Sequence, residues 1–167
     1  KDLVSAPPPT DESQPQRVAD WLVHVNPGFT GEELPPLVGA PMVVGTGAVY
    51  SGLAVHISTA LYYCEHPTLS TGKPLEEIAS SLAELAAYYA MAIRTELVLQ
   101  RVATFDLIGG SWGGLMGHQM AIAARRISFA SRRLVFLDPM PPVVGGVPNT
   151  SPVPLRQTIA GVVMIHL

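Results

Sequence analysis

Residues 105–114 have the sequence Phe-Asp-Leu-Ile-Gly-Gly-Ser-Trp-Gly-Gly, and this stretch decides the fold of the 167-residue chain. A short apolar run stands on one side of the glycines and a helix-like run, residues 114–127, on the other. Ser111 is the serine of a Gly-x-Ser-x-Gly pattern, in which small neighbours let a strand and a helix approach closely while the hydroxyl stays exposed. The stretch therefore predicts a nucleophile elbow.

The elbow also places backbone chemistry at the start of the helix. The N–H of Trp112 would lie at the helix start, where it can stabilise an oxyanion. A glycine-rich turn that only binds a ligand, or only packs, is the alternative interpretation of the same residues. The apolar strand before the turn and the helix after it favour the elbow.

Apolar runs and helical patterns alternate along the whole chain. Strands are expected at residues 21–25, 37–44, 61–64, 105–108 and 134–137, and helices at 49–59, 74–99 and 114–127. Residues 67–73 are expected to form a loop, and residues 157–167 one more short element. This alternation is typical of α/β proteins and predicts a parallel sheet with helices on both faces, whose sites lie at the carboxyl ends of the strands.

Composition limits the class of protein. Hydrophobic residues make up 48% of the chain and charged residues 14%, which is typical of a folded domain and not of a disordered one. The net charge of −3 gives no reason to expect nucleic acid as a partner. Because Cys64 is the only cysteine, internal disulfides and cysteine-based zinc sites are excluded, and no metal is expected.

The ends of the chain and one uncharged window bear on domain organisation and location. Residues 1–16 are rich in proline and polar groups and are expected to be a flexible tail, followed by one domain over 17–167. Residues 37–64 contain no charged side chain, yet Pro41 and four glycines favour buried strands and a helix over a transmembrane segment. The sequence contains no recognisable signal peptide, so the location stays open, with the cytoplasm or the interior of an organelle as the expectation.

Asp138 is the candidate acid of a catalytic triad. It directly follows the apolar run 134–137, so it is expected at the same edge of the sheet as Ser111. In hydrolases of this architecture the order along the chain is Ser, then Asp or Glu, then His. The alternative is an aspartate that stabilises a turn before Pro139.

Four stretches between residues 36 and 142 contain motifs that are informative when they are taken together. They are residues 41–47 together with Tyr50, the helical segment 82–94, the elbow region 105–121 and the strand-like run 134–138. Together they resemble the amino-terminal part of the type I thioesterase domains that end polyketide, fatty-acid and nonribosomal-peptide synthases. The resemblance implies an α/β-hydrolase fold that stops before the last strands.

The resemblance also implies a function and site residues. Ser111 would accept an acyl group from the phosphopantetheine arm of a carrier protein, and Asp138 would orient a histidine. Backbone N–H groups of Trp112 and Val43 would form the oxyanion hole. The substrate carries the arm, so no bound cofactor is implied, and the implied partners are an acyl carrier protein or other synthase domains.

The catalytic histidine is not found in this chain. The histidine of the family lies far downstream of the aspartate, whereas His166 is the only histidine after Asp138 and comes too early. Three explanations remain open: a piece of a larger enzyme, a histidine from a partner chain, or a catalytically degenerate hydrolase-fold subunit. Such a subunit would bind or support a larger, even membrane-associated, complex whose other subunits cover the incomplete sheet.

Four arginines near the end of the elbow helix form a possible docking surface: Arg125, Arg126, Arg132 and Arg133. A basic surface would attract an acidic carrier protein. The alternative is a solvated helix end, where cations are favoured by the helix dipole.

Overall fold

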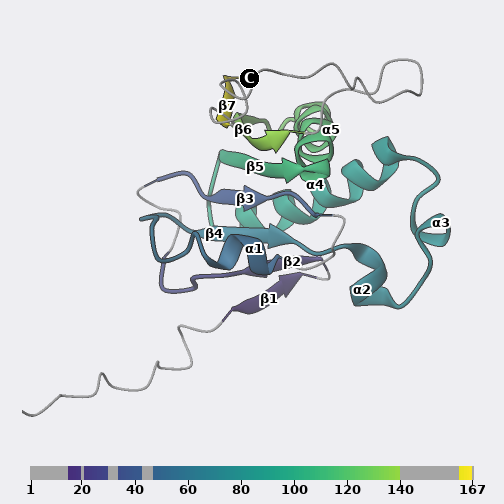
Figure 1. The fold of residues 1–167 in the computed structure, drawn as a ribbon, viewed down its shortest axis with the longest axis horizontal. Helices are drawn as coiled ribbons and strands as arrows, with labels where there is room; N and C mark the ends of the chain where they lie inside the picture. The colour runs from purple at the N-terminus through teal and green to yellow at the C-terminus, as the bar shows by residue number, and fades with distance from the viewer. Residues whose placement is uncertain (1–14, 20, 30–33, 43–46, 140–161, 167) are drawn as a thin grey trace, which may run out of the picture.

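The computed structural model describes residues 15–19, 21–29, 34–42, 47–139 and 162–166. Within them seven strands form one sheet in the order β1-β2-β4-β3-β5-β6-β7 (Figure 1). The strands are β1 (Gln16–Ala19), β2 (Leu22–His24), β3 (Leu37–Gly39), β4 (Leu61–Cys64), β5 (Phe105–Ser111), β6 (Ser131–Pro139) and β7 (Val162–His166).

The sheet is mixed, so the prediction of a parallel sheet is correct only for its centre. Strands β4, β3, β5 and β6 run parallel to one another. Strands β1 and β2 pair antiparallel, because the short link between them leaves room only for a tight reversal. Strand β2 is antiparallel to β4, and β7 returns antiparallel to β6 at the other edge.

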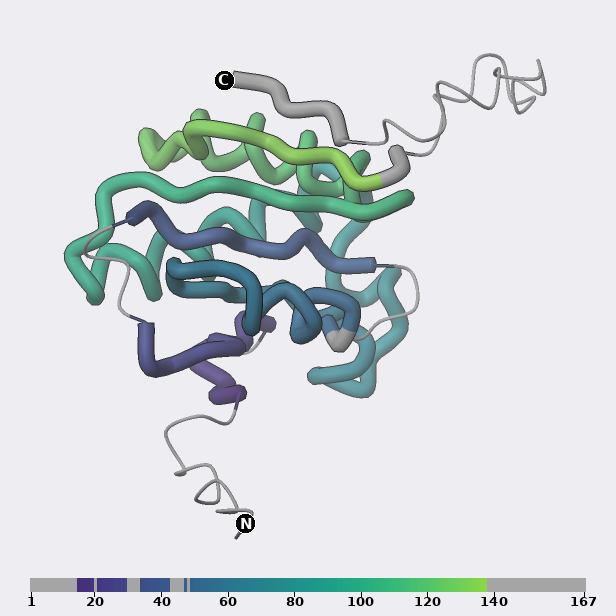
Figure 2. Tube along the Cα trace, turned by 60° about the vertical axis from the view of Figure 1, so that its left-hand side comes forward, coloured from purple at the N-terminus to yellow at the C-terminus, as the bar shows by residue number. Residues whose placement is uncertain are grey.

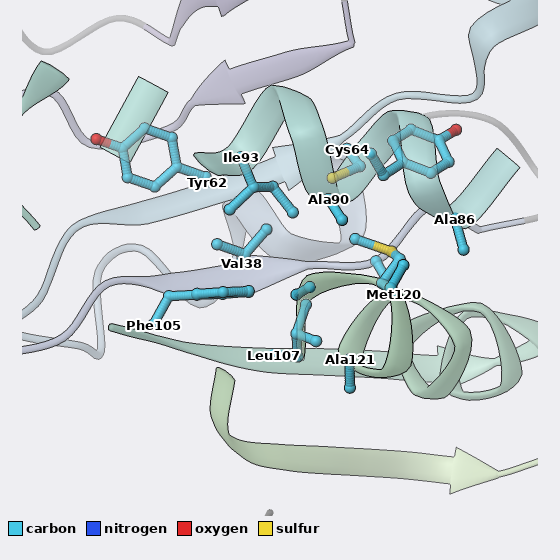
Figure 3. Close-up of a cluster of buried hydrophobic side chains, with 14 of the residues drawn as sticks. Val38, Tyr62, Cys64, Ala86, Ala90, Ile93, Phe105, Leu107, Met120 and Ala121 are labelled. Carbon is cyan, nitrogen blue, oxygen red and sulfur yellow. The ribbon is translucent and has the colours of Figure 1, made fainter. Parts of the chain in front are cut away.

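Two long helices cover one face of the sheet and a short one lies on the other (Figures 1 and 2). The helices are α1 (Ala48–Ser51), α2 (Pro67–Thr71), α3 (Leu75–Ile78), α4 (Leu82–Leu99) and α5 (Trp112–Arg126). The main core lies between the sheet and α4 and α5, and it includes Val38, Ile93, Leu107 and Met120 (Figure 3). Each such buried side chain stabilises the fold by about 1.5–3 kcal/mol. A smaller cluster around Tyr50 lies under α1.

The prediction of a single helix over 74–99 is wrong, because the structure has two helices there, α3 and α4. Ser81 is the N-cap residue of α4, and its hydroxyl accepts a hydrogen bond from the Glu84 N–H at 3.2 Å. The Glu84 carboxylate in turn accepts from the N–H and hydroxyl of Ser80, at 2.7 and 2.6 Å. This Ser-x-x-Glu arrangement is a capping box, which satisfies N–H groups at a helix start and so favours a new start here.

The other sequence predictions differ from the structure mainly at their ends. The strands expected at 21–25, 61–64, 105–108 and 134–137 are confirmed as β2, β4, β5 and β6, and the element expected within 157–167 includes β7. The expected helix 49–59 is wrong in length, since only Ala48–Ser51 is helical and turns follow. The expected loop 67–73 contains α2, and Gln16, expected in the tail, already belongs to β1.

The uncharged window 37–64 contains β3, α1 and β4 in its described parts. Among the described residues, no helix is both long enough and apolar enough to cross a membrane. The expected tail itself, residues 1–14, lies outside the described residues.

Candidate active site

Ser111 stands on a strained turn where β5 ends and α5 begins. Its backbone angles, φ 51° and ψ −121°, are unusual for a residue with a side chain. Such a conformation costs about 1–3 kcal/mol and persists only where the surrounding structure enforces it. The side chain is exposed and makes no capping hydrogen bond with its own helix. The strand, sharp turn and helix of the predicted elbow are therefore present, and the Ser111 side chain is exposed.

Close packing of three glycines enforces this turn. A Cβ on Gly109 would overlap the carbonyl group of Gly113 and lie 2.7 Å from the Gly114 nitrogen. A Cβ on Gly114 would lie 2.7 Å from the ring of Phe136 on β6, and one on Gly113 would lie 3.1 Å from the Pro41 carbonyl oxygen. Backbone atoms occupy the space of a side chain at Gly109, so β5 and α5 can approach this closely only with glycine there, while Gly113 and Gly114 pack tightly against the segment after β3 and against β6.

The segment after β3 meets the elbow where the oxyanion hole was predicted. The N–H of Ala40 donates to the Ile108 carbonyl at 2.8 Å, which carries the pairing of β3 and β5 beyond Gly39. Met42 lies near both Gly110 and Gly113, since a Cβ on either would be 3.6 Å from its side chain. Val43, the predicted second oxyanion donor, lies outside the described residues. Trp112, the other predicted donor, is the first residue of α5.

Tyr50 supports this junction from the other face of the sheet. Its hydroxyl donates to the Ala40 carbonyl at 2.9 Å and lies 3.4 Å from the Ile108 carbonyl, and its ring fills the space beside Gly39. Burial raises the pKa of Tyr50 to about 12, so the hydroxyl keeps its proton at neutral pH. Tyr50 was noticed in the sequence as part of the resemblance, but its position as a brace under the elbow was not predicted.

Asp138 lies next to the elbow in the backbone of the sheet. Leu137 pairs with Gly110, and Pro139 pairs with Ser111. Asp138, between them, is thus at the carboxyl end of β6, one strand away from the serine. This is the position along the sheet at which an acid would be expected, and the orientation of its side chain stays a prediction.

An apolar hollow of about 270 Å³ lies beside Trp112. Trp112, the next residue after Ser111, forms one wall, and α3 with the start of α4 forms the others. Leu75, Leu82 and Leu85 supply apolar surface, and Glu76 and Ser80 are among its polar residues. The sequence did not predict this hollow, because it forms between α3, the start of α4 and Trp112, which come together only in the folded chain.

Among the histidines whose side chains the structure describes, none is hydrogen-bonded to Ser111. His24 is buried on β2, stacked on Tyr62 with ring centroids 4.3 Å apart, and burial lowers its pKa. His66 lies just after β4, at the same edge as the elbow, but its Nδ1 is 2.8 Å from the Thr68 hydroxyl. His56 is exposed in the turns after α1.

The two remaining histidines lie away from the serine. His118 is two turns further along α5, about 10 Å of helix from Ser111. His166 pairs with Arg133, near the amino end of β6, whereas Ser111 pairs with Pro139 at its carboxyl end. Six residues of strand separate these two positions, which is about 20 Å. The antiparallel course of β7 therefore places the backbone of His166 at the wrong edge for the triad.

The four arginines do not form one surface next to the serine. Arg125 and Arg126 are exposed at the last turn of α5. Arg132 instead forms a two-pronged ion pair with Asp106, with a nitrogen–oxygen distance of 2.8 Å. All four residues lie at the end of α5 or the start of β6, which is the end of the strands opposite the elbow. A carrier protein held there would face away from Ser111.

The described residues contain no group of three or more His, Cys, Asp or Glu side chains that would hold a metal ion. Cys64 is buried in the main core, and burial raises the pKa of its thiol. The groups at the elbow are the Ser111 hydroxyl and backbone N–H groups, and the backbone of Asp138 lies on the neighbouring strand. Such a set suits acyl transfer through a serine, once an imidazole is at hand.

Comparison with known proteins agrees with this arrangement. The family model for the thioesterase domain matches residues 35–162. No curated protein matches the chain by sequence. Many solved structures match its fold.

Three solved structures illustrate the likeness. The NocB thioesterase domain from the nocardicin cluster has 24% identity and a TM-score of 0.59, over 72% of this chain and 51% of that one. YbtT, a type II thioesterase from the yersiniabactin NRPS/PKS biosynthetic pathway, has 17% identity and a TM-score of 0.53, over 74% and 49%. The lipase BlEst2 of Bacillus licheniformis has 14% identity and a TM-score of 0.53, over 72% and 47%. The chain thus has the α/β-hydrolase fold and spans about half the length of these proteins.

Proposed function

The chain belongs to the thioesterase domain family, and we propose that it carries the nucleophile of a serine thioesterase that releases acyl chains from a carrier-protein thioester. The observation that supports this most is the elbow itself. Ser111 is exposed and held at a positive φ, and a Cβ on the nearby Gly109 would overlap the Gly113 carbonyl group. Strain of this kind is typically retained where the turn positions a reacting group.

The proposed reaction has two steps. The Ser111 oxygen attacks the thioester carbonyl carbon while an imidazole takes the hydroxyl proton, and the tetrahedral intermediate expels the thiol of the arm, which takes that proton. Water, activated by the same imidazole, then attacks the acyl-serine, and the products are a carboxylic acid and free Ser111. Asp138 would orient the imidazole from the neighbouring strand.

Backbone N–H groups would stabilise the negative charge that develops on the carbonyl oxygen. The N–H of Trp112, the first residue of α5, would be one donor, and the N–H of Val43, in the segment that follows Met42 in the sequence, would be the other. Tyr50 would hold that segment in place through the Ala40 carbonyl. The acyl chain would lie along the apolar hollow beside Trp112.

The mechanism needs an imidazole within hydrogen-bond reach of Ser111. A second candidate function is that of a hydrolase-fold subunit with a binding or structural role. The exposed apolar side chains of α4, among them Tyr88, Met91 and Leu99, would then face a partner subunit. The two functions differ in whether Ser111 reacts.

Intact-mass measurement with a fluorophosphonate probe separates them. An active thioesterase is expected to gain one probe mass, and Ser111→Ala to lose that labelling. Ser128→Ala is a matched control, because Ser128 is also an exposed serine with positive φ, at 57°, but stands outside the elbow. The control should label like the unchanged chain.

A folded chain that takes up no probe would contradict the proposed activity. Folding is checked on the same sample by a cooperative thermal transition. Such a result would favour the binding subunit, and labelling that survives Ser111→Ala would show that another residue is the nucleophile.

A further inference from the structure

The β1–β2 hairpin is joined to the rest of the sheet by a short antiparallel pairing. Both strands lie at one edge of the sheet, and β2 is the one that pairs with β4 (Figure 1). Just before β2, the Trp21 ring packs edge-on against Tyr88 and Tyr89 of α4, with centroids 5.6 and 5.7 Å away. His24, the last residue of β2, pairs with Tyr62 of β4. The hairpin is therefore held on α4 at one end of β2 and on β4 at the other.

His24 makes this pairing sensitive to protonation. The residue is 7% exposed, and its Nε2 atom is buried with no hydrogen-bond partner. Its ring stacks on that of Tyr62, with 4.3 Å between the centroids and an angle of 20° between the planes. A proton on Nε2 would bury both a positive charge and an N–H group that nothing accepts, which is far less favourable than a bare nitrogen. The closed hairpin therefore favours the neutral ring.

The side chains that face the ring from the neighbouring strands carry no charge at neutral pH. On β4 these are Tyr62 and Cys64, which lie on the α4 side of the sheet (Figure 3). Burial raises the pKa of the Tyr62 hydroxyl to about 12, and burial also raises the pKa of the Cys64 thiol. On β1, Gln16 pairs with His24 and has no titratable group. These neighbours offer no negative charge to an imidazolium.

Two carboxylates of the described residues lie on the elements packed against the hairpin, and both have other partners. Glu96 of α4 accepts a hydrogen bond from Gln100 at 2.6 Å, and Glu65, just after β4, forms an ion pair with Arg17 of β1. Burial lowers the pKa of His24, and a hydrogen bond with the backbone of Phe29 opposes this only in part. The closed hairpin thus binds a proton at His24 more weakly than an exposed histidine would.

Weaker proton binding in the closed hairpin means that acid favours the open one. Because Nε2 is buried, a proton reaches it only when β2 moves away from β4. Well above the ordinary histidine pKa of about 6.5, both forms are neutral and the pairing has its full stability. As the pH falls below that value, the open form binds a proton that the closed form does not, so the pairing loses stability.

We propose that His24 is a pH-sensitive switch, which holds the β1–β2 hairpin on β4 while the ring is neutral and releases the hairpin when the ring binds a proton. Release uncovers the edge of β4 and the aromatic side chains that Trp21 contacts on α4. Such local opening does not require the whole sheet to unfold. The switch does not depend on the reactivity of Ser111, because β4 and β3 lie between β2 and β5.

Hydrogen exchange of the full chain, followed by mass spectrometry, tests the proposal. Exchange is measured at about pH 7.5 and about pH 5.5, above the range in which ordinary carboxylates titrate, and corrected for the chemical effect of pH. Protection of residues 16–25 should fall several-fold at the lower pH. The ceiling is about tenfold, since that pH lies one unit below the ordinary histidine pKa. Residues 105–126, which form β5 and α5, should keep their protection.

His24→Phe separates the switch from other effects of acid. The variant keeps an aromatic ring against Tyr62 but cannot bind a proton, so its hairpin should be equally protected at both pH values. His56→Phe is the matched control, the same exchange at an exposed histidine, and it should keep the pH response. A response that persists in His24→Phe would overturn the proposal. So would an unchanged chain whose hairpin ignores pH, or one in which β5 and α5 lose as much protection as the hairpin.

An NMR titration of the unchanged chain tests the switch without any variant. At about pH 6.5, where an exposed imidazole is about half charged, the His24 ring should still give the signals of the neutral form. The ring is identified by its contacts with the Tyr62 ring. A His24 ring that is charged at this pH while the hairpin keeps its full protection would overturn the proposal.

Discussion

Two turns border the candidate active site, and they are held in opposite ways. The elbow at Ser111 is held by packing, because a Cβ on Gly109 would overlap backbone atoms and because Gly113 and Gly114 are tightly packed. The junction at Ser80 and Ser81 is held by hydrogen bonds of exposed side chains to backbone N–H groups. Packing does not respond to pH, whereas a carboxylate in water does. The elbow should therefore tolerate a change of pH but not a larger side chain. The junction should tolerate a larger side chain but respond to pH.

The largest effect that would sharpen this comparison is expected from Gly109→Ala. The added Cβ would overlap the Gly113 carbonyl, which is backbone and cannot rotate away, so we expect a loss of more than about 3 kcal/mol in the free energy of unfolding. Gly110→Ala is the matched control, since its Cβ would meet its nearest neighbours at 3.6 Å, an ordinary contact. Urea denaturation of both variants measures the difference. Equal losses would mean that the elbow is not held by packing.

A smaller effect is expected from Tyr50→Phe. The variant keeps the ring against Gly39 but leaves the buried Ala40 carbonyl without the tyrosine hydroxyl, which should cost about 1–2 kcal/mol. Fluorophosphonate labelling of Ser111 should slow as well, because the segment that precedes Val43 loses its brace. Tyr63→Phe serves as control, since that hydroxyl is only 3.5 Å from Glu65. A Tyr50→Phe chain of unchanged stability would show that the brace is unimportant.

The smallest effect is expected at the junction, through pH. Hydrogen bonds from the Ser80 hydroxyl and N–H lower the pKa of Glu84 below its ordinary value. A group with a lowered folded pKa stabilises the protein above its unfolded pKa, and the contribution disappears as the pH falls through the folded pKa. On acidification below about pH 4.5, the melting temperature of the unchanged chain should therefore decrease by more than that of Glu84→Gln. Glu76→Gln, on the exposed face of α3, is the control and should fall like the unchanged chain.

Much of the fold and part of the site could be predicted from the sequence, for local reasons. A strand, a glycine-rich turn and a helix are defined by neighbouring residues, so the elbow, four of the strands and α5 were recognisable. The capping box was also written in the sequence, as Ser81-x-x-Glu84, but the long apolar stripe around it suggested one helix. The break between α3 and α4 was therefore not predicted, because the apolar periodicity of residues 74–99 outweighed the local capping signal.

The sequence by itself determined that Ser111 follows a strand and that Asp138 follows another. Only the tertiary structure decided which groups meet, because pairing across the sheet joins residues far apart in the chain. It placed the backbone of Asp138 one strand from Ser111 and that of His166 at the opposite edge, since β7 runs antiparallel to β6. It also set Tyr50 under the elbow and turned Arg132 away from Arg125 to Asp106. Hydrophobic pattern fixes which residues face the core, but direction and register of pairing fix their neighbours.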